Sequence, residues 1–318
     1  MVAIAKALAR KLLPFELRQE LRRRRYVRGR RGRRLWYFAA RSSVWKAFLE
    51  EKVGERVGYR MNIAEPTTFS EKVQWRKLYD RRSLLPQLAD KVSARAYVEA
   101  LEIPDLYLPE LLFESSQPSQ IPFDSLEPPS VIKANNGCGG HWFIRDRSEL
   151  DRDAVISDMN GKLRTWYGRE SLQWVYGQIT PKVMVERMLL TDDDQVPPDF
   201  KFYVFDGKVR LILVSLDRST QLKQVFLDRD WNRLELRKQY PIAESVDIPS
   251  ESDTMRHIAE KLGEGLDFAR TDLYLCNGTV YFGEFTLYPS DGKAPFNPVS
   301  YDSWLGKQWK LPSVSGRA

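Results

Sequence analysis

The first 130 residues have the apolar spacing and the turn residues of a helical region. Residues 1–58 predict basic helices, and a turn at Pro66 predicts a helix that begins near Ser70. Asp90 predicts the N-cap of a further helix over residues 91–101. A connector rich in Pro and Ser then ends near residue 130, where we place a domain boundary.

Beyond this boundary, short runs of β-branched and aromatic residues predict strands. They cover residues 131–134, 142–144, 182–190, 200–205, 209–215 and a last hairpin over 270–287. Helices are predicted near 149–163 and over 254–266, and the second has one apolar stripe. The pattern therefore indicates an α+β protein.

The last hairpin contains Arg270, Asp272 and Glu284, and the position of its turn decides whether the two acids share a face. A two-residue turn at Asn277-Gly278 would send Glu284 to the opposite face from Asp272. A three-residue loop with a left-handed Gly278 in a bulge would instead pair Glu284 with Arg270 and Asp272 with Phe282. We predict this second register. The apolar face would then hold Leu273, Leu275, Tyr281, Phe285 and Leu287.

Composition excludes several classes of protein. The chain has 318 residues, of which 42% are hydrophobic, and no apolar run approaches the roughly 20 residues of a membrane span. Cys138 and Cys276 provide neither a disulfide framework nor a zinc spacing. With only His141 and His257 present, carboxylates, Lys and Arg are expected to carry any chemistry.

Positive charge is concentrated at the N-terminus. Residues 1–36 hold thirteen Lys or Arg against two Glu, while the whole chain has a net charge of +7. This tail is suited to an anionic membrane surface, nucleic acid or an acidic glycan, and a solvated basic helix explains it equally well. The aromatic residues are not interleaved with basic ones beyond the tail, which argues against a nucleic-acid platform.

Two segments carry groups that can bind phosphate or a cation. Lys133 ends a predicted strand and precedes the glycine-rich segment 135–140, which lacks the spacing of a P-loop and is also compatible with a plain β-turn. Asp272 and Glu284 suit magnesium, although surface acids on a hairpin are the alternative. Glu186 interrupts an apolar strand, where an edge-strand salt bridge is equally compatible. Cys138 is interpreted as a small filler residue.

In this order the segments resemble the TupA-like ATP-grasp family of bacterial polysaccharide biosynthesis, over about residues 60–312. The resemblance rests on residues 66–72, 75–80, 90–91, 131–133, 185–186, 199–208, 270–274 and 281–287. It implies an ATP-grasp fold, with two α+β subdomains that clamp ATP. The expected regions are a basic helical extension (1–58), a helical substrate region (59–130), a lid subdomain (131–189) and a metal-binding subdomain (190–318).

The resemblance also implies roles for individual residues. Lys91 and Lys133 would contact the nucleotide phosphates, together with the loop residues Asn136, Gly137, Gly139 and Gly140. Adenine would face Glu186, Arg187, Met188 and Leu189, and Asp199 would hold the ribose. Lys201 and Arg270 would act on the reacting phosphoryl group, and Asp272 and Glu284 would bind Mg²⁺. Thr286 stands where many ATP-grasp ligases have Asn, so at the second metal position it would supply a hydroxyl in place of an amide oxygen.

The leading hypothesis is an ATP- and magnesium-dependent carboxylate–amine ligase that forms an acyl phosphate. Its substrate would be a glycan or an amino-acid-like small molecule. Its expected location is the cytoplasm, and association with the inner membrane face through the basic tail is the alternative. A kinase or a glycosyltransferase of the same pathway is the alternative. The non-enzymatic alternative is a membrane-associated adaptor with a vestigial nucleotide fold.

Overall fold

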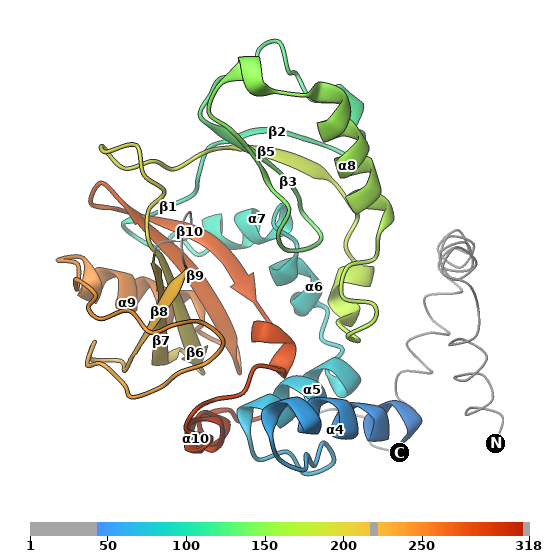
Figure 1. The fold of residues 1–318 in the computed structure, drawn as a ribbon, viewed down its shortest axis with the longest axis vertical. Coiled ribbons are helices and arrows are strands. Elements are labelled where there is room, and N and C mark those ends of the chain that lie inside the picture. The colour runs from blue at the N-terminus through green and yellow to red at the C-terminus, as the bar shows by residue number, and fades with distance from the viewer. Residues whose placement is uncertain (1–42, 217–221, 314–318) are drawn as a thin grey trace.

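The computed structural model describes residues 43–216 and 222–313, which form two β-sheets with helices packed on them (Figure 1). The larger sheet has six strands in the order β1-β10-β9-β6-β7-β8, and the smaller has four in the order β2-β5-β3-β4. The basic tail, residues 1–36, lies outside the described residues. Within the described ranges, no helix is long and apolar enough to cross a bilayer.

The smaller sheet contains the predicted strands near residues 131, 142 and 182, together with one that was not predicted. Its strands are β2 (Leu111–Ser115), β3 (Ser130–Ala134), β4 (Trp142–Ile144) and β5 (Val183–Arg187). Helix α8 (Arg152–Arg164) packs Val155 and Met159 against this sheet, and the 3₁₀ turns η1 (Pro118–Gln120) and η2 (Arg147–Glu149) flank it. Because β2 pairs with β5, the sheet begins before the predicted boundary near residue 130.

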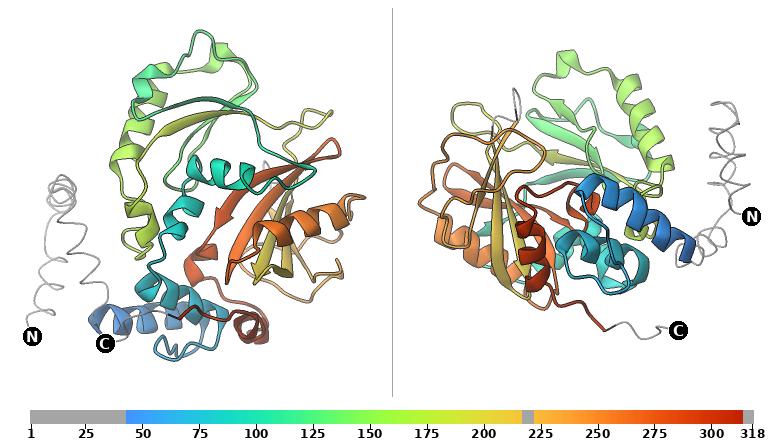
Figure 2. Two further views of the ribbon diagram at one scale, coloured as in Figure 1. Left: turned by 180° about the vertical axis from the view of Figure 1, so that it is seen from behind. Right: turned by 60° about the horizontal axis from the view of Figure 1, so that its bottom comes forward.

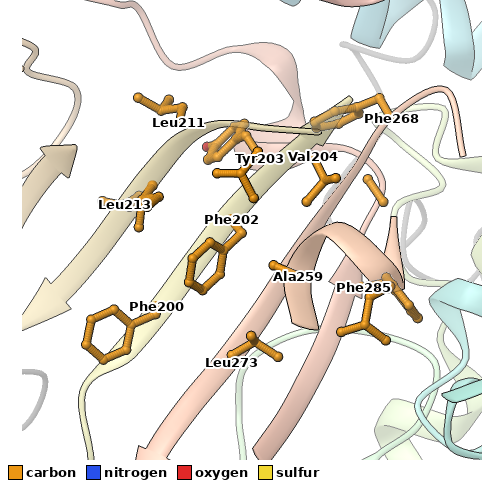
Figure 3. Close-up of a cluster of buried hydrophobic side chains, with 14 of the residues drawn as sticks. Phe200, Phe202, Tyr203, Val204, Leu211, Leu213, Ala259, Phe268, Leu273 and Phe285 are labelled. Carbon is orange, nitrogen blue, oxygen red and sulfur yellow. The ribbon is translucent and has the colours of Figure 1, made fainter. Parts of the chain in front are cut away.

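Helix α9 covers one apolar face of the larger sheet, which includes Phe200, Phe202 and Leu273 (Figures 2 and 3). Its strands are β1 (Leu106–Tyr107), β6 (Asp199–Phe205), β7 (Lys208–Leu216), β8 (Lys223–Leu227), β9 (Ala269–Cys276) and β10 (Thr279–Thr286). Helix α9 (Ser252–Leu262) buries its predicted stripe completely at Met255, Ile258, Ala259 and Leu262. The turn Asp206-Gly207 has positive φ at both residues, as a type I′ hairpin requires.

The remaining helices lie at one end of the larger sheet and between the two sheets (Figures 1 and 2). They are α4 (Ser43–Val57), α5 (Phe69–Tyr79), α6 (Leu84–Ala89), α7 (Ser93–Glu99) and α10 (Ser300–Gln308), with the 3₁₀ turns η3 (Trp174–Gly177) and η4 (Pro289–Gly292). The predicted helix near Ser70 is α5, which begins with a capping box between Thr68 and Glu71. Asp90 accepts hydrogen bonds from the Val92 amide and the Ser93 hydroxyl, just before the shorter helix α7.

The β9–β10 hairpin differs from the predicted register. Asn277 and Gly278 both have positive φ, 49° and 74°, and Cys276 pairs with Thr279. This is a two-residue turn, which Asn-Gly favours because its twist matches that of the strands. The predicted three-residue loop is therefore wrong, although the positive φ at Gly278 is confirmed.

A bulge at Gly283 then changes the pairing within the same hairpin. Phe282 pairs with Leu273, whereas Glu284 pairs with Asp272 and Thr286 with Arg270. The extra residue returns Glu284 to the face of Asp272. A glycine is required here, because a Cβ atom at residue 283 would lie 2.9 Å from the carbonyl oxygen of Asp272.

The corrected register also moves one apolar side chain. Tyr281 pairs with Tyr274 and so lies on the face of Asp272, where its ring is 6.2 Å from that of Tyr107. It was predicted on the core face. Val280 and Phe282 occupy the core positions instead, and both are buried.

Candidate active site

Charged side chains gather on the face of the larger sheet that is turned away from α9. Backbone pairing places Lys201 of β6 opposite Asp272 of β9, and Asp272 opposite Glu284 of β10. Directly opposed residues of antiparallel strands lie on one face, so these three side chains are neighbours. The bulge, rather than the turn, is what brings the two carboxylates together.

Asp272 is held by two cations. The Arg270 Nε and Nη2 atoms donate to its two oxygens at 2.7 and 2.6 Å, and Lys201 Nζ donates at 3.0 Å. Arg270 Nη2 also donates to the Thr286 hydroxyl at 2.8 Å. Lys201 contacts Asp199 as well, so one continuous network runs across β6, β9 and β10.

Lys91 joins this network to the segment beside the smaller sheet. Its Nζ lies 3.2 Å from Glu284 Oε2, and it also donates to the carbonyl oxygen of Gly137 in the glycine-rich loop. Burial opposes ionisation of Glu284, but Lys91, Arg270 and Lys201 outweigh it and lower the pKa of this carboxyl to about 2. Glu284 is therefore ionised at neutral pH.

A second ion-pair group lies in the smaller sheet. Glu186 is 5% exposed and accepts from Lys133 Nζ and, at 2.9 Å, from Arg95 Nη1. Strand β5 lies between β2 and β3, so Glu186 is not on an edge strand. Arg95 on α7 was not anticipated, because only the fold brings this helix next to β5.

The glycine-rich loop connects β3 to β4 and is anchored at its start. The buried Asn135 side chain donates to Asp90 at 2.8 Å and accepts from the Lys182 amide at 2.7 Å. Asn136 is also buried, whereas Gly139 and Gly140 are exposed and have positive φ. Cys138 is not a buried filler, because it is exposed and its Sγ lies 2.7 Å from the Tyr167 hydroxyl.

Residues 187–189 begin the connection between the two sheets. The Met188 amide donates to the Pro129 carbonyl at 3.0 Å, and Arg187 lies 3.3 Å from Glu110. Met188 is buried and Leu189 half-buried. Asp199 starts β6 and is also buried, so the predicted adenine and ribose residues lie where the chain passes from one sheet to the other (Figure 1).

His141 follows the glycine-rich loop and was not predicted as a site residue. Its Nδ1 is buried and has no hydrogen-bond partner among the described residues. Burial, with Lys133 and Lys91 nearby, lowers its pKa to about 4, so the ring is neutral at pH 7. A histidine directly after a glycine-rich loop is the only sequence signal that points to it.

Comparisons with known proteins show the family of this chain. A family model described as TupA-like ATPgrasp matches residues 71–310. The chain belongs to this family. This TupA-like protein accordingly has the α+β ATP-grasp fold that its sequence predicted. A comparison with curated proteins gave no match.

Solved ATP-grasp structures are similar to this TupA-like chain at low identity. D-alanine–D-alanine ligase from Bacillus anthracis is 18% identical, with 63% of this chain and 57% of that chain covered and a TM-score of 0.36. L-amino acid ligase from Bacillus licheniformis is 16% identical, with 70% and 49% covered and a TM-score of 0.40. The ATP-grasp ligase PsnB with its minimal precursor is 13% identical, with 70% and 64% covered and a TM-score of 0.37. The chain spans less than two thirds of each of these proteins.

The donor atoms of the TupA-like site fit a magnesium ion. Asp272 and Glu284 are directly opposed, and Thr286 Oγ1 donates to Glu284 at 3.3 Å, so the available donors are all oxygens. The described ranges contain no group of three or more His, Cys, Asp or Glu that could hold a metal. Mg²⁺ suits such a site, because it takes one or two carboxylates and completes its shell with phosphates and water.

Proposed function

We propose that this TupA-like ATP-grasp protein is an ATP- and magnesium-dependent ligase that joins a carboxylate to an amine through an acyl phosphate. The observation that carries the proposal is the ion-pair network from Lys91 through Glu284 and Arg270 to Asp272. It combines cations that suit a polyphosphate with carboxylates that suit a divalent ion. It also spans the two parts of the molecule between which a nucleotide would lie.

We assign the nucleotide phosphates to Lys91 and Lys133, covered by the loop residues Asn136, Gly137, Gly139 and Gly140. Both lysines already contact a carboxylate, Glu284 or Glu186, which holds their long side chains in place. Adenine is assigned to Glu186 and residues 187–189, and the ribose to Asp199. These assignments follow the family pattern and the position of the connection between the sheets.

Magnesium would be held by Asp272 and Glu284, with Thr286 beside them, and would neutralise charge on the phosphates. Lys201 and Arg270 lie on the same face and contact Asp272. We therefore assign them to the reacting phosphoryl group, whose negative charge they stabilise.

In the proposed reaction a substrate carboxylate oxygen attacks the γ-phosphorus of ATP. The bond from this phosphorus to the β–γ bridging oxygen breaks, and ADP leaves. The amine nitrogen then attacks the acyl carbon, loses a proton and displaces inorganic phosphate. Positioning and electrostatics supply the rate enhancement, which is what a site of lysines, arginine and carboxylates provides.

Membership of the TupA-like family supports a glycan or amino-acid-like substrate in cell-surface polysaccharide synthesis. We also propose that the reaction takes place on the cytoplasmic side, where ATP is available.

The test is ADP release by the full-length protein with ATP, Mg²⁺ and a panel of amino acids and uronic-acid-containing glycan precursors. Release of ADP and phosphate that requires both an acid and an amine supports the proposal. Hydroxylamine should intercept the acyl phosphate as a hydroxamate. Formation of AMP, or γ-phosphate retained stably on a product, contradicts it, and the second outcome indicates a kinase.

Matched carboxylate variants show whether the activity belongs to this site. Asp272→Asn removes a carboxylate from the network, whereas Asp193→Asn changes an exposed loop residue. We expect ADP release to be lost in the first variant and retained in the second. Equal activity in both would contradict the assignment.

A further inference from the structure

The connection between α8 and β5, residues 165–182, leaves the smaller sheet and returns to it (Figure 1). In this connection η3 lies against α6, and its buried residues Trp174 and Val175 belong to the same apolar cluster as residues of β6, β7 and β9. Leu172 is buried in a second cluster, together with Trp75 of α5. Because α5 also packs on the larger sheet, the connection is anchored to the part of the molecule that contains this sheet.

A buried polar side chain fixes the same connection to the segment that follows β10. Gln173 Nε2 donates to the Asp291 carboxylate at 2.8 Å, and Asp291 lies in η4. The backbone amide of Gln173 donates to the carbonyl oxygen of Gly168 at 2.9 Å, which closes a short loop. Tyr167 comes directly before this loop. Its backbone position is therefore set by contacts with α5, α6 and η4.

The side chain of Tyr167 reaches from this connection to the glycine-rich loop of the smaller sheet. Its hydroxyl lies 2.7 Å from Cys138 Sγ. Its ring lies against Gly137, where an added Cβ atom would be 3.1 Å from the ring. The ring also makes an edge-to-face contact with Tyr176 of η3, with the centroids 4.9 Å apart. Since Tyr176 packs against the apolar cluster of the larger sheet, Tyr167 links the loop to that sheet.

Two lysines also hold the loop, through its carbonyl oxygens. Lys91 donates to Gly137, and Lys162 of α8 donates to Gly140. Lys91 is assigned to the nucleotide phosphates, and a bound phosphate would compete with the Gly137 carbonyl for its ammonium group. The loop would then lose one of its contacts at the moment when it has to cover the phosphates.

Tyr167 differs from these lysines because it carries no charge. Burial is the main cause that raises its pKa above the ordinary value of 10, so the hydroxyl stays protonated at neutral pH. An uncharged side chain is not attracted to a phosphate, so Tyr167 can keep its contacts with residues 137 and 138 when Lys91 changes partner. The ring contact with the backbone of Gly137 is available because this residue has no side chain.

We propose that Tyr167 is a positioning residue that holds residues 137 and 138 of the glycine-rich loop over the nucleotide phosphates. This inference rests on the function proposed above, and it adds the side chain by which the larger-sheet part of the molecule fixes the loop of the smaller sheet. Tyr167 acts on the nucleotide through the loop. Its loss should therefore weaken nucleotide binding without a change in the charges of the site.

The first measurement needs no nucleotide. ¹⁵N relaxation of protein labelled at glycine reports the motion of Gly137, Gly139 and Gly140. We expect their order parameters to fall by about 0.2 or more in Tyr167→Ala, and to fall less in Tyr167→Phe, which keeps the ring. Tyr240→Phe, at an exposed tyrosine between β8 and α9, is the matched control and should leave them unchanged. Unchanged order parameters in a folded Tyr167→Ala variant overturn the inference.

The second measurement is calorimetric titration with Mg²⁺ and the ATP analogue AMPPNP. We expect the Kd to rise by roughly tenfold in Tyr167→Ala and by about threefold in Tyr167→Phe, which loses only the hydrogen bond. Cys138→Ala should match Tyr167→Phe, and the double variant should be no weaker than either, because both substitutions remove the same bond. Cys138→Ser offers the hydroxyl a new partner and should bind like the unsubstituted protein.

An unchanged Kd in a folded Tyr167→Ala variant, or additive effects in the double variant, overturns the inference. If the unsubstituted protein binds no AMPPNP, the proposed function fails. The relaxation measurement then still shows whether Tyr167 holds the loop, so the two failures are distinguishable.

Discussion

The charged side chains of the site neutralise one another in the free protein. Lys133 contacts Glu186, Lys91 contacts Glu284, and Lys201 lies between two aspartates. In the proposed function, the negative charge of ATP would compete with these carboxylates for the same lysines, and magnesium would compete with the lysines for Asp272 and Glu284. Binding of nucleotide and metal would therefore exchange partners within a network that already exists.

Removal of Lys133 should reduce turnover without unfolding the protein. In Lys133→Ala the phosphates lose a point charge, so we expect kcat/KM to fall on the order of a hundredfold or more. Glu186 keeps Arg95 as its partner, so the buried carboxylate stays paired. Steady-state kinetics measure the loss of turnover, and circular dichroism shows whether the variant is folded. Near-normal activity in a folded variant would contradict the assignment of Lys133 to the phosphates.

His141 should make stability depend on pH in a defined range. Its pKa is lowered from 6.5 to about 4 in the folded protein, so the unfolded chain binds more protons between these values. Above pH 6.5 the neutral ring makes its full contribution to the free energy of unfolding. This contribution is lost as the pH falls from 6.5 toward 4. The stability difference between the protein and His141→Gln should therefore shrink from about pH 7 to about pH 5.

Urea denaturation of both proteins at the two pH values measures this difference, and NMR of the His141 ring follows the titration directly. His257→Gln assigns the signals, because the chain has two histidines. A stability difference that is the same at both pH values would contradict the prediction.

At the scale of elements, one residue of the β9–β10 hairpin aligns the proposed metal site. The turn Asn277-Gly278 alone would leave Glu284 on the opposite face from Asp272, and the bulge at Gly283 reverses this. The bulge depends on the absence of a side chain, since a Cβ atom would also lie 2.9 Å from the Tyr274 ring.

Gly283→Ala should therefore impair the site more than the fold. The new methyl group must displace the backbone of Asp272, so we expect ADP release to fall and the Mg²⁺ concentration for half-maximal activity to rise. The control is Gly161→Ala in α8, where the Cβ atom meets nothing within 4 Å. It should keep activity and gain about 0.5–1 kcal/mol of stability from helix propensity. An unchanged magnesium requirement in Gly283→Ala would show that the bulge is not needed for the metal.

At the scale of the whole molecule, charged side chains of the helical segment between the two sheets contact both of them. Lys91 links Glu284 of the larger sheet to the loop that leaves the smaller one, and Arg95 reaches Glu186 from α7. By contrast, α5 is firmly packed on the larger sheet: Arg76 is fully buried, stacks on the Trp309 ring at 4.4 Å and pairs with Asp267 at 2.7 Å. This packing connects α5 to the described C-terminal segment.

The basic tail should be separable from the nucleotide site. Deletion of residues 1–36 removes an excess of eleven positive charges, and we expect ATP affinity to be unchanged. Association with vesicles that contain anionic lipid should weaken, and in the full-length chain it should decline with salt. Vesicle sedimentation measures the membrane association of the full-length and truncated proteins, and ATP titration measures their affinity for the nucleotide. Loss of ATP binding on truncation would refute the separation.

Local signals predicted most elements of this protein. The apolar stripe of α9 and the turn at Pro66 before α5 each act within a few residues, so both can be predicted from the sequence. Strands β1, β2 and β8 were missed. They are short, and each pairs with a strand whose position is set by the rest of the fold.

The residues of the candidate site also divide into those that a local sequence pattern indicates and those that it does not. Lys133, Asp272 and Glu284 were identified because a cation before a glycine-rich loop and two acids on a hairpin are local patterns. Arg95 and His141 were not identified, because only the fold brings them next to Glu186 and to Lys133. The register of β9 and β10 at the Asn277-Gly278 turn was also predicted incorrectly.

The sequence by itself determined the α+β class, the family pattern and the residue types that can meet a phosphate and a cation. The tertiary structure alone decided which faces they share. The reason is that a register is selected by all the strands that pair with it: β9 is fixed by β6, where Lys201 opposes Asp272, and β10 meets this register through the bulge at Gly283. Burial and neighbouring charges, which lower the pKa of His141 and of Glu284, follow from the same long-range contacts.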